Sequence, residues 1–227
     1  MEQAVVGSRS SVVGFRIAAL VGGAVLVAAA AQVSVPLPGT PVPMTLQPMA
    51  VLLVGGLLGA RLGALSMILY LAMGAAGLPV FTPTVPLLGV ARLFGPTGGY
   101  LLAYPVAAWA TGWFADPGRQ PGDKTNRVQF SDPGRQPGEN ESLRAGVLVN
   151  PGLPPGVREP WAQVALGVVA GLLLIHLGGL AQLALLTGNL SAAARFGTWP
   201  FLLGDLIKIA VLVPVLAKLT PSIRARL

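Results

Sequence analysis

The chain has 227 residues, of which 53% are hydrophobic and only 10% are charged, and its mean hydropathy is +0.71. Such a composition excludes an ordinary soluble globule and predicts an all-α membrane protein. The net charge of +7 is better explained by the placement of Lys and Arg relative to a membrane than by nucleic acid, so no nucleic-acid partner is expected.

The first predicted span is an uncharged run, residues 17–31, that follows a polar segment. This pattern also resembles a signal peptide, but we expect an uncleaved helix. The span contains small residues four apart, which allow another helix to approach closely. That helix could belong to the same bundle or to a docked partner. The residues concerned are Ala19, Gly23, Ala24 and Ala28.

Two proline-rich stretches, 32–47 and 79–97, are predicted to be extended connectors, because proline removes a backbone donor and disfavours helix before it. Between them we expect a second span, 48–60, and a third, 62–78, separated by Arg61.

The composition changes after a fourth predicted span at 98–115. Residues 116–160 contain six of the eight acids and a repeated heptad, Asp-Pro-Gly-Arg-Gln-Pro-Gly. Such a segment predicts a flexible hydrophilic insert. A fifth span at 161–187, a short polar connector and a sixth span at 199–219 complete a single six-helix bundle. The predicted segments are 1–16 (N-terminal), 17–115 (helices 1–4), 116–160 (insert), 161–219 (helices 5–6) and 220–227 (tail).

Six spans place both termini on one side. Twelve of the 15 Lys and Arg residues lie on that side, two lie on the other, and one lies within a span. This asymmetry predicts a multi-pass protein of the cell membrane with both termini cytoplasmic.

The sixth span contains an acid and a base three residues apart, Asp205 and Lys208. On a helix both side chains lie on one face, and each costs a few kcal/mol at membrane depth, so a polar group should meet that face. The alternative is that the two charges neutralise one another near the headgroups.

With cytoplasmic termini, these two residues lie in the outer half of the bundle. Arg92, Thr45 and Gln47 are on the outer side too, so the sequence predicts a small-molecule pocket open to the outside. The alternatives are that Arg92 is a solvated loop cation and that Gln47 only caps a helix.

The single histidine, His176, lies deep in the fifth span. A lone buried histidine is more often a neutral packing residue than a ligand. No metal site is expected, and no cysteine is present to form one. The sequence has no Gly-x-x-x-x-Gly-Lys-Ser/Thr, His-Glu-x-x-His or Gly-x-Ser-x-Gly motif, so we do not expect an enzyme, although an intramembrane enzyme using Asp205 stays an alternative.

Four stretches resemble the BioY family, the biotin-binding S components of energy-coupling-factor (ECF) transporters, and occur in the family's order. They are Pro-Val-Pro-Met-Thr-Leu-Gln at 41–47, Gly-Ala-Ala-Gly-Leu-Pro-Val-Phe at 74–81, Gly-Pro-Thr-Gly-Gly-Tyr at 95–100 and Gly-Asp-Leu-Ile-Lys at 204–208.

The resemblance implies a subunit that binds biotin from outside and works with a membrane T component and two cytoplasmic ATPases. It implies no cofactor in this chain, and it places Asp205, Lys208 and an arginine, for which Arg92 is the candidate, in the ligand site. Biotin's ureido N–H groups, ureido oxygen and carboxylate suit such side chains. A carrier of another small anionic vitamin is the nearest alternative. The candidate ligand-binding residues are Asp205, Lys208, Arg92, Gln47, Thr45, Tyr100, Phe81 and Met44.

Overall fold

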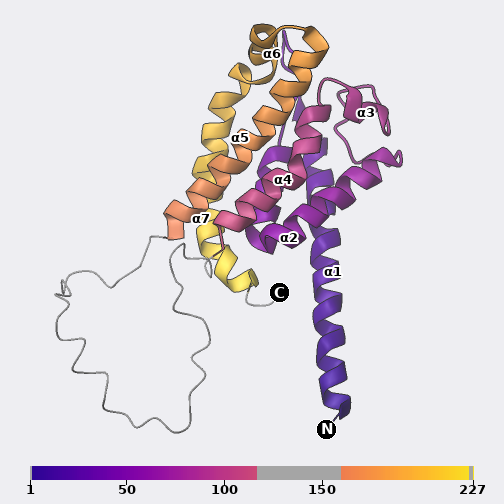
Figure 1. The fold of residues 1–227 in the computed structure, drawn as a ribbon, viewed down its shortest axis with the longest axis vertical. Helices are drawn as coiled ribbons and strands as arrows, with labels where there is room; N and C mark the ends of the chain where they lie inside the picture. The colour runs from indigo at the N-terminus through magenta and orange to yellow at the C-terminus, as the bar shows by residue number, and fades with distance from the viewer. Residues whose placement is uncertain (1, 117–159, 225–226) are drawn as a thin grey trace, which may run out of the picture.

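The computed structural model describes residues 2–116, 160–224 and 227. The predicted insert at 116–160 therefore lies outside the described residues except at its two ends. The described chain is mostly helical, as its composition predicts (Figure 1). Its elements are α1 (Glu2–Gln32), β1 (Ser34–Val35), β2 (Met44–Thr45), α2 (Gln47–Ala75), α3 (Ala91–Phe94), α4 (Gly98–Phe114), α5 (Pro160–Thr187), α6 (Leu190–Gly197), the 3-10 helix η1 (Trp199–Phe201) and α7 (Leu202–Arg224).

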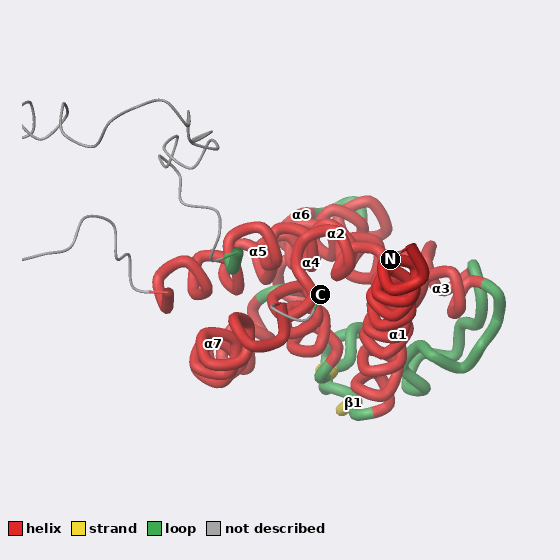
Figure 2. The backbone as a smooth tube through the Cα atoms, turned by 90° about the horizontal axis from the view of Figure 1, so that it is seen from below, coloured by secondary structure: helices red, strands yellow, loops and turns green. Residues whose placement is uncertain are grey.

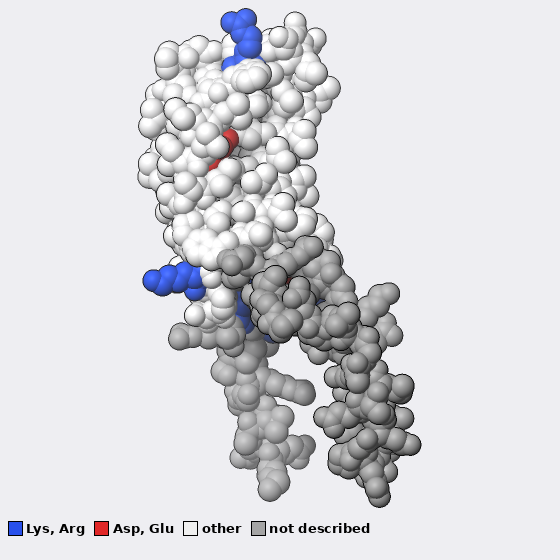
Figure 3. All heavy atoms as spheres, turned by 90° about the vertical axis from the view of Figure 1, so that its left-hand side faces the viewer, with Lys and Arg blue, Asp and Glu red and all other residues white. Residues whose placement is uncertain are grey.

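Within the described residues, four stretches are helical, long and apolar enough to cross a membrane. Figure 3 shows charged side chains near the ends of the molecule and a wide, almost uncharged band between them, as expected of a surface in contact with hydrocarbon. The chain is therefore a multi-pass membrane protein. The four stretches are Val13–Gln32, Gln47–Ala75, Trp161–Thr187 and Leu190–Arg224.

The second and third predicted spans form one element, α2, with a sharp kink at Gly59. Gly59 has a φ of 84°, in the region that favours glycine. A Cβ built on Gly63 would lie 2.8 Å from the Cα of Gly55, whereas residues eight apart in a straight helix are about 12 Å apart. The chain therefore bends sharply at Gly59, and the two halves of α2 run in different directions from it (Figure 1).

Helix α4 lies between α2 and α5 and contacts both (Figure 2). Glycines allow these close contacts: the backbones of Gly99 and Gly178 touch between α4 and α5, and Gly55 meets the backbone of Ala108 between α2 and α4. A Cβ at these glycines would overlap the neighbouring backbone, so glycine is required for the observed helix separation.

The first connector is extended, as predicted. Its strands β1 and β2 pair antiparallel, with Ser34 opposite Thr45. The connector then reaches the C-terminal half of the chain, where Thr40 Oγ1 donates a hydrogen bond of 2.6 Å to the carbonyl oxygen of Phe196. This hydrogen bond therefore connects the first connector to α6.

Two other connectors contain helices that the sequence analysis did not predict. The stretch at 79–97 contains α3, and most of the polar connector at 188–198 is α6. Asn189 caps α6, because its side-chain oxygen accepts from the backbone N–H groups of Ser191 and Ala192.

The two ends of the described chain lie at the same end of the molecule (Figure 1). Arg16 Nε of α1 donates a hydrogen bond of 2.6 Å to the backbone oxygen of Leu227.

Candidate functional site

Asp205 and Lys208 lie on one face of α7 and point into the bundle. Lys208 Nζ is 2.8 Å from Asp205 Oδ1, and the two residues are only 7% and 8% exposed. The predicted shared face is confirmed. The two charges do pair with one another, as the alternative also held, but both side chains are enclosed by protein rather than extended towards lipid headgroups.

His176 joins this pair from α5. Its Nε2 atom lies 2.5 Å from Asp205 Oδ2, so each carboxylate oxygen of Asp205 has a protein partner. The ring of His176 also meets that of Tyr100 edge-on, with centroids 6.4 Å apart. The sequence analysis favoured a packing role for His176. The structure adds it to the polar cluster, which no local spacing could reveal because 29 residues separate it from Asp205.

The cluster lines a pocket with about 600 Å³ of empty space, counting the part that is open to solvent. The pocket collects seven of the eight predicted ligand-binding residues from the first connector, α2, the second connector, α4 and α7. These are Thr45, Gln47, Phe81, Arg92, Tyr100, Asp205 and Lys208.

Arg92 is buried in the pocket wall, with 1% of its surface exposed, so it is not a solvated loop cation. Its Nη2 donates to the carbonyl oxygen of Thr82 at 2.7 Å, and Nη1 donates to those of Val85 and Leu87. Among the described residues, its buried Nε has no hydrogen-bond partner. Burial lowers the pKa of the guanidinium, whose ordinary value is so high that the group stays charged. Arg92 thus fixes the second connector and presents a positive charge at the pocket.

Gln47 is held at the pocket by a residue that the sequence analysis did not single out. Its Nε2 donates to the hydroxyl of Tyr70 at 2.5 Å, and this hydroxyl donates to the carbonyl oxygen of Val80 at 3.3 Å. The side chain of Gln47 therefore faces the second half of α2, and no side chain caps the start of α2.

The aromatic candidates Tyr100 and Phe81 line the pocket, and contacts with other elements hold each of them. Tyr100 donates its hydroxyl proton to the carbonyl oxygen of Gly197 at 2.6 Å, which links α4 to the end of α6. Phe81 packs edge-on against Tyr70, with ring centroids 5.5 Å apart. Tyr104, which is 3% exposed, also lines the pocket.

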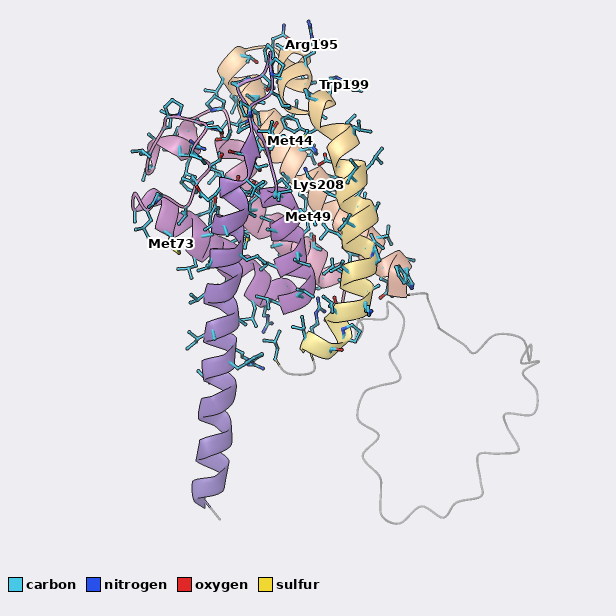
Figure 4. The ribbon with its side chains drawn as sticks, turned by 180° about the vertical axis from the view of Figure 1, so that it is seen from behind. Met44, Met49, Met73, Arg195, Trp199 and Lys208 are labelled. Carbon is cyan, nitrogen blue, oxygen red and sulfur yellow. The ribbon has the colours of Figure 1, made fainter. Side chains whose placement is uncertain are left out.

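Met44 lies outside this pocket, in a neighbouring apolar groove that we call the Met44 groove. Figure 4 shows Met44, Met49 and Lys208 along the same side of the bundle, beside α7. Thr45 and Lys208 line both the groove and the pocket, so they form part of the wall between them. The residues of the groove are Val33, Val35, Met44, Thr45, Leu46, Met49, Gly204, Ile207, Lys208 and Val211.

The small residues of α1 lie largely in contacts within the chain. Gly23 faces Ser66 and Val54 of α2, and Ala24 is fully buried, whereas Ala19 and Ala28 are partly exposed. Packing within the bundle therefore accounts for Gly23 and Ala24, and docking of a partner on this helix stays a prediction.

The charged groups around the pocket define what it can bind. Asp205 and Lys208 offset one another, while Arg92 has no acidic partner among the ion pairs of the described residues. Asp205, Lys208 and Arg92 together give the pocket a net charge of about +1, which suits a monoanion. Among the described residues there is no group of three or more His, Cys, Asp or Glu side chains that could hold a metal ion.

Comparison with known proteins identifies a family and several relatives. A model described as the BioY family matches residues 7–225. A "Probable biotin transporter BioY" of Pyrococcus horikoshii is 45% identical over 87 residues, which are 38% of this chain and 51% of that protein. A "Biotin transporter BioY" of Rhizobium etli is 27% identical over 171 residues, which cover 75% of this chain and 74% of that protein. The chain thus spans only about half the length of the Pyrococcus relative.

One solved structure has the same fold. It is the crystal structure of the S-component for biotin from an ECF-type ABC transporter, which superimposes with a TM-score of 0.65. The superposition covers 94% of this chain and 92% of that chain at 21% sequence identity, so the likeness concerns the fold alone.

Proposed function

This chain belongs to the BioY family, and on that premise we propose that it binds biotin in the pocket around Asp205. We further propose that it is the substrate-capture subunit of an ECF-type uptake transporter. The relatives' names, which are those of biotin transporters, support transport rather than intramembrane catalysis.

The observation that carries the proposal is the buried cluster of Asp205, Lys208 and His176, which lines the same pocket as Arg92. Biotin has two ureido N–H donors, a ureido oxygen, an apolar bicyclic body and a carboxylate tail. Asp205 retains unused lone pairs for a ureido N–H, while Lys208 and Arg92 supply donors for the ureido oxygen and the carboxylate. Phe81, Tyr100 and Tyr104 provide apolar surface for the rings, and the net charge of the pocket matches one carboxylate.

We propose six membrane crossings with both termini in the cytoplasm. The kink at Gly59 supports two crossings by α2, and α4, whose 17 residues extend about 25 Å, is long enough for one more. An even number of crossings is supported by the Arg16–Leu227 contact, which places the C-terminal end of the chain beside the start of the first predicted span, 17–31. The excess of Lys and Arg on the terminus side supports the orientation, which makes the pocket open outward.

We propose that transport is energised by partner proteins, namely a transmembrane T component and two ATP-binding subunits. The absence of a Gly-x-x-x-x-Gly-Lys-Ser/Thr motif in the sequence is consistent with this division of labour. Docking on α1 would use the side chains that the bundle leaves exposed, such as Ile17, Val21 and Val25.

Titration calorimetry on the purified protein in detergent tests the ligand. We expect biotin to bind the unmodified protein, and we expect Asp205→Ala and Lys208→Ala each to weaken binding by roughly 10-fold or more. Leu203→Ala is the matched control, because Leu203 lies on the same helix and is 73% exposed. Tight binding of a different vitamin, with no heat from biotin, would refute the proposed ligand.

A further inference from the structure

The hydrogen bond between His176 and Asp205 links two helices, α5 and α7, at the pocket. His176 lies on α5 and Asp205 on α7, and their contact is made where both side chains line the pocket. The sequence motif that contains Asp205 and Lys208 does not include this histidine.

The hydrogen bonds define the role of each ring nitrogen. An ionised carboxylate is only an acceptor, so Nε2 of His176 must donate its proton to Asp205 Oδ2. Nδ1 is buried and has no protein partner among the described residues. The geometry therefore places a ring proton on Nε2, directed at the carboxylate.

The same contacts determine which lone pairs of Asp205 remain available. A carboxylate has about four acceptor positions, of which His176 and Lys208 occupy one on each oxygen. The carboxylate is held from two helices, since Lys208 lies on α7 with Asp205 and His176 lies on α5. It cannot rotate without losing at least one of these bonds.

We propose that His176 is a positioning residue of the binding site, which orients the Asp205 carboxylate so that its free lone pairs face the ligand's N–H donors. This inference rests on the proposed function, because it assigns a role in the same site. Tyr100 contributes by packing edge-on against the ring.

Three substitutions of His176 separate positioning from space filling, with biotin as the probe. His176→Gln keeps an N–H donor near the position of Nε2, whereas His176→Asn keeps a donor too close to the backbone to reach Asp205, and His176→Leu keeps only apolar volume. Calorimetry should show roughly 10- to 100-fold weaker binding for Asn and Leu, and Gln should recover most of that loss. Leu177→Ala, at the neighbouring position of α5, should bind like the unmodified protein because Leu177 is 60% exposed.

A double-mutant cycle distinguishes this role from a general effect on structure. In an Asp205→Ala background the effect of His176→Leu on affinity should fall to less than threefold, because the orienting bond has already been lost. The thermal midpoint of each variant in detergent reports whether it folds, and any His176→Leu sample that fails to fold is replaced in the cycle by His176→Asn.

Three results would overturn the inference. The first is unchanged biotin affinity in folded His176→Leu. The second is a full, additive loss in the Asp205→Ala background. The third is an equal loss in Gln, Asn and Leu, which would mean that the ring shape matters rather than its donor. If instead the unmodified protein does not bind biotin, the proposed function fails as well, so the two failures are distinguishable.

Discussion

Arg224 near the end of α7 donates a hydrogen bond of 2.7 Å from Nη2 to the carbonyl oxygen of Gly56 in α2. The same nitrogen donates at 3.0 Å to the carbonyl oxygen of Gly112 in α4. A single side chain thus satisfies carbonyl groups of two helices at the end of the bundle where the chain termini lie.

Arg224→Ala should destabilise the fold, because it removes these donors from partly buried carbonyl groups. We expect a loss of about 2 kcal/mol in the free energy of unfolding, measured by thermal or denaturant unfolding in detergent. Arg195→Ala is the control, since Arg195 is exposed at the other end of the molecule (Figure 4). Equal stability of the two variants would contradict the bracing role of Arg224.

Gly59→Ala should strain the kink in α2, because its φ of 84° lies in a region that alanine rarely adopts. A loss of about 1–2 kcal/mol in unfolding free energy is expected. Gly22→Ala provides the comparison: Gly22 lies in α1, and a Cβ there would meet no atom within 4 Å. A Gly59→Ala protein as stable as Gly22→Ala would mean that the turn does not require glycine.

The ion pair of Asp205 and Lys208 should show non-additive effects on stability. Asp205→Ala leaves the ammonium of Lys208 buried without its counterion, at an expected cost of about 3–5 kcal/mol, whereas removing both charges avoids that penalty. The double variant Asp205→Ala, Lys208→Ala should therefore unfold at a higher temperature than Asp205→Ala alone. The reverse order of the two midpoints would show that Lys208 reaches water once Asp205 is removed.

Arg92→Lys should weaken ligand binding although the charge is kept. The guanidinium contacts three carbonyl groups of the second connector at once, and a lysine ammonium cannot reproduce this planar arrangement. We expect roughly 10-fold weaker binding of biotin by calorimetry, together with faster protease cleavage between residues 82 and 87. Lysine variants with unchanged affinity and unchanged cleavage would show that the positive charge alone is sufficient.

Replacement of residues 118–158 by a short Gly/Ser linker should leave biotin affinity unchanged. The prediction comes from composition, because this stretch has few apolar residues with which to line a pocket. Calorimetry on the shortened protein provides the test. A marked loss of affinity in a folded sample would mean that the insert takes part in binding.

The parts of the site that the sequence predicted depend on local spacing. Asp205 and Lys208 are three residues apart, and the helix period alone places them on one face. His176 and Tyr70 could not be predicted in the same way, because their partners Asp205 and Gln47 are 29 and 23 residues away and the contacts depend on how the helices pack. The local pattern of the sequence carries no signal for such contacts.

The fold, too, was predictable where a local sequence pattern exists and not where long-range packing decides the structure. Apolar runs identified the helices, and prolines identified the extended first connector. The sharp bend at Gly59 and the small helix α6 were harder to predict, because a glycine can pack, turn or break a helix with equal ease. Asn189 before α6 was the one available signal of a helix start, and its capping bonds show why the helix begins there.

The wall that Thr45 and Lys208 form between the pocket and the Met44 groove has an electrostatic consequence for a bound anion. In a bilayer, hydrocarbon rather than water would lie behind a partition about one side chain thick. Medium of low polarizability on that side would screen the charges of Lys208 and its partner Asp205 less than water does, and would strengthen the interaction of both with the guest. The thinness of this partition would therefore strengthen the attraction of Lys208 for a carboxylate beyond what the same residue achieves at an aqueous surface.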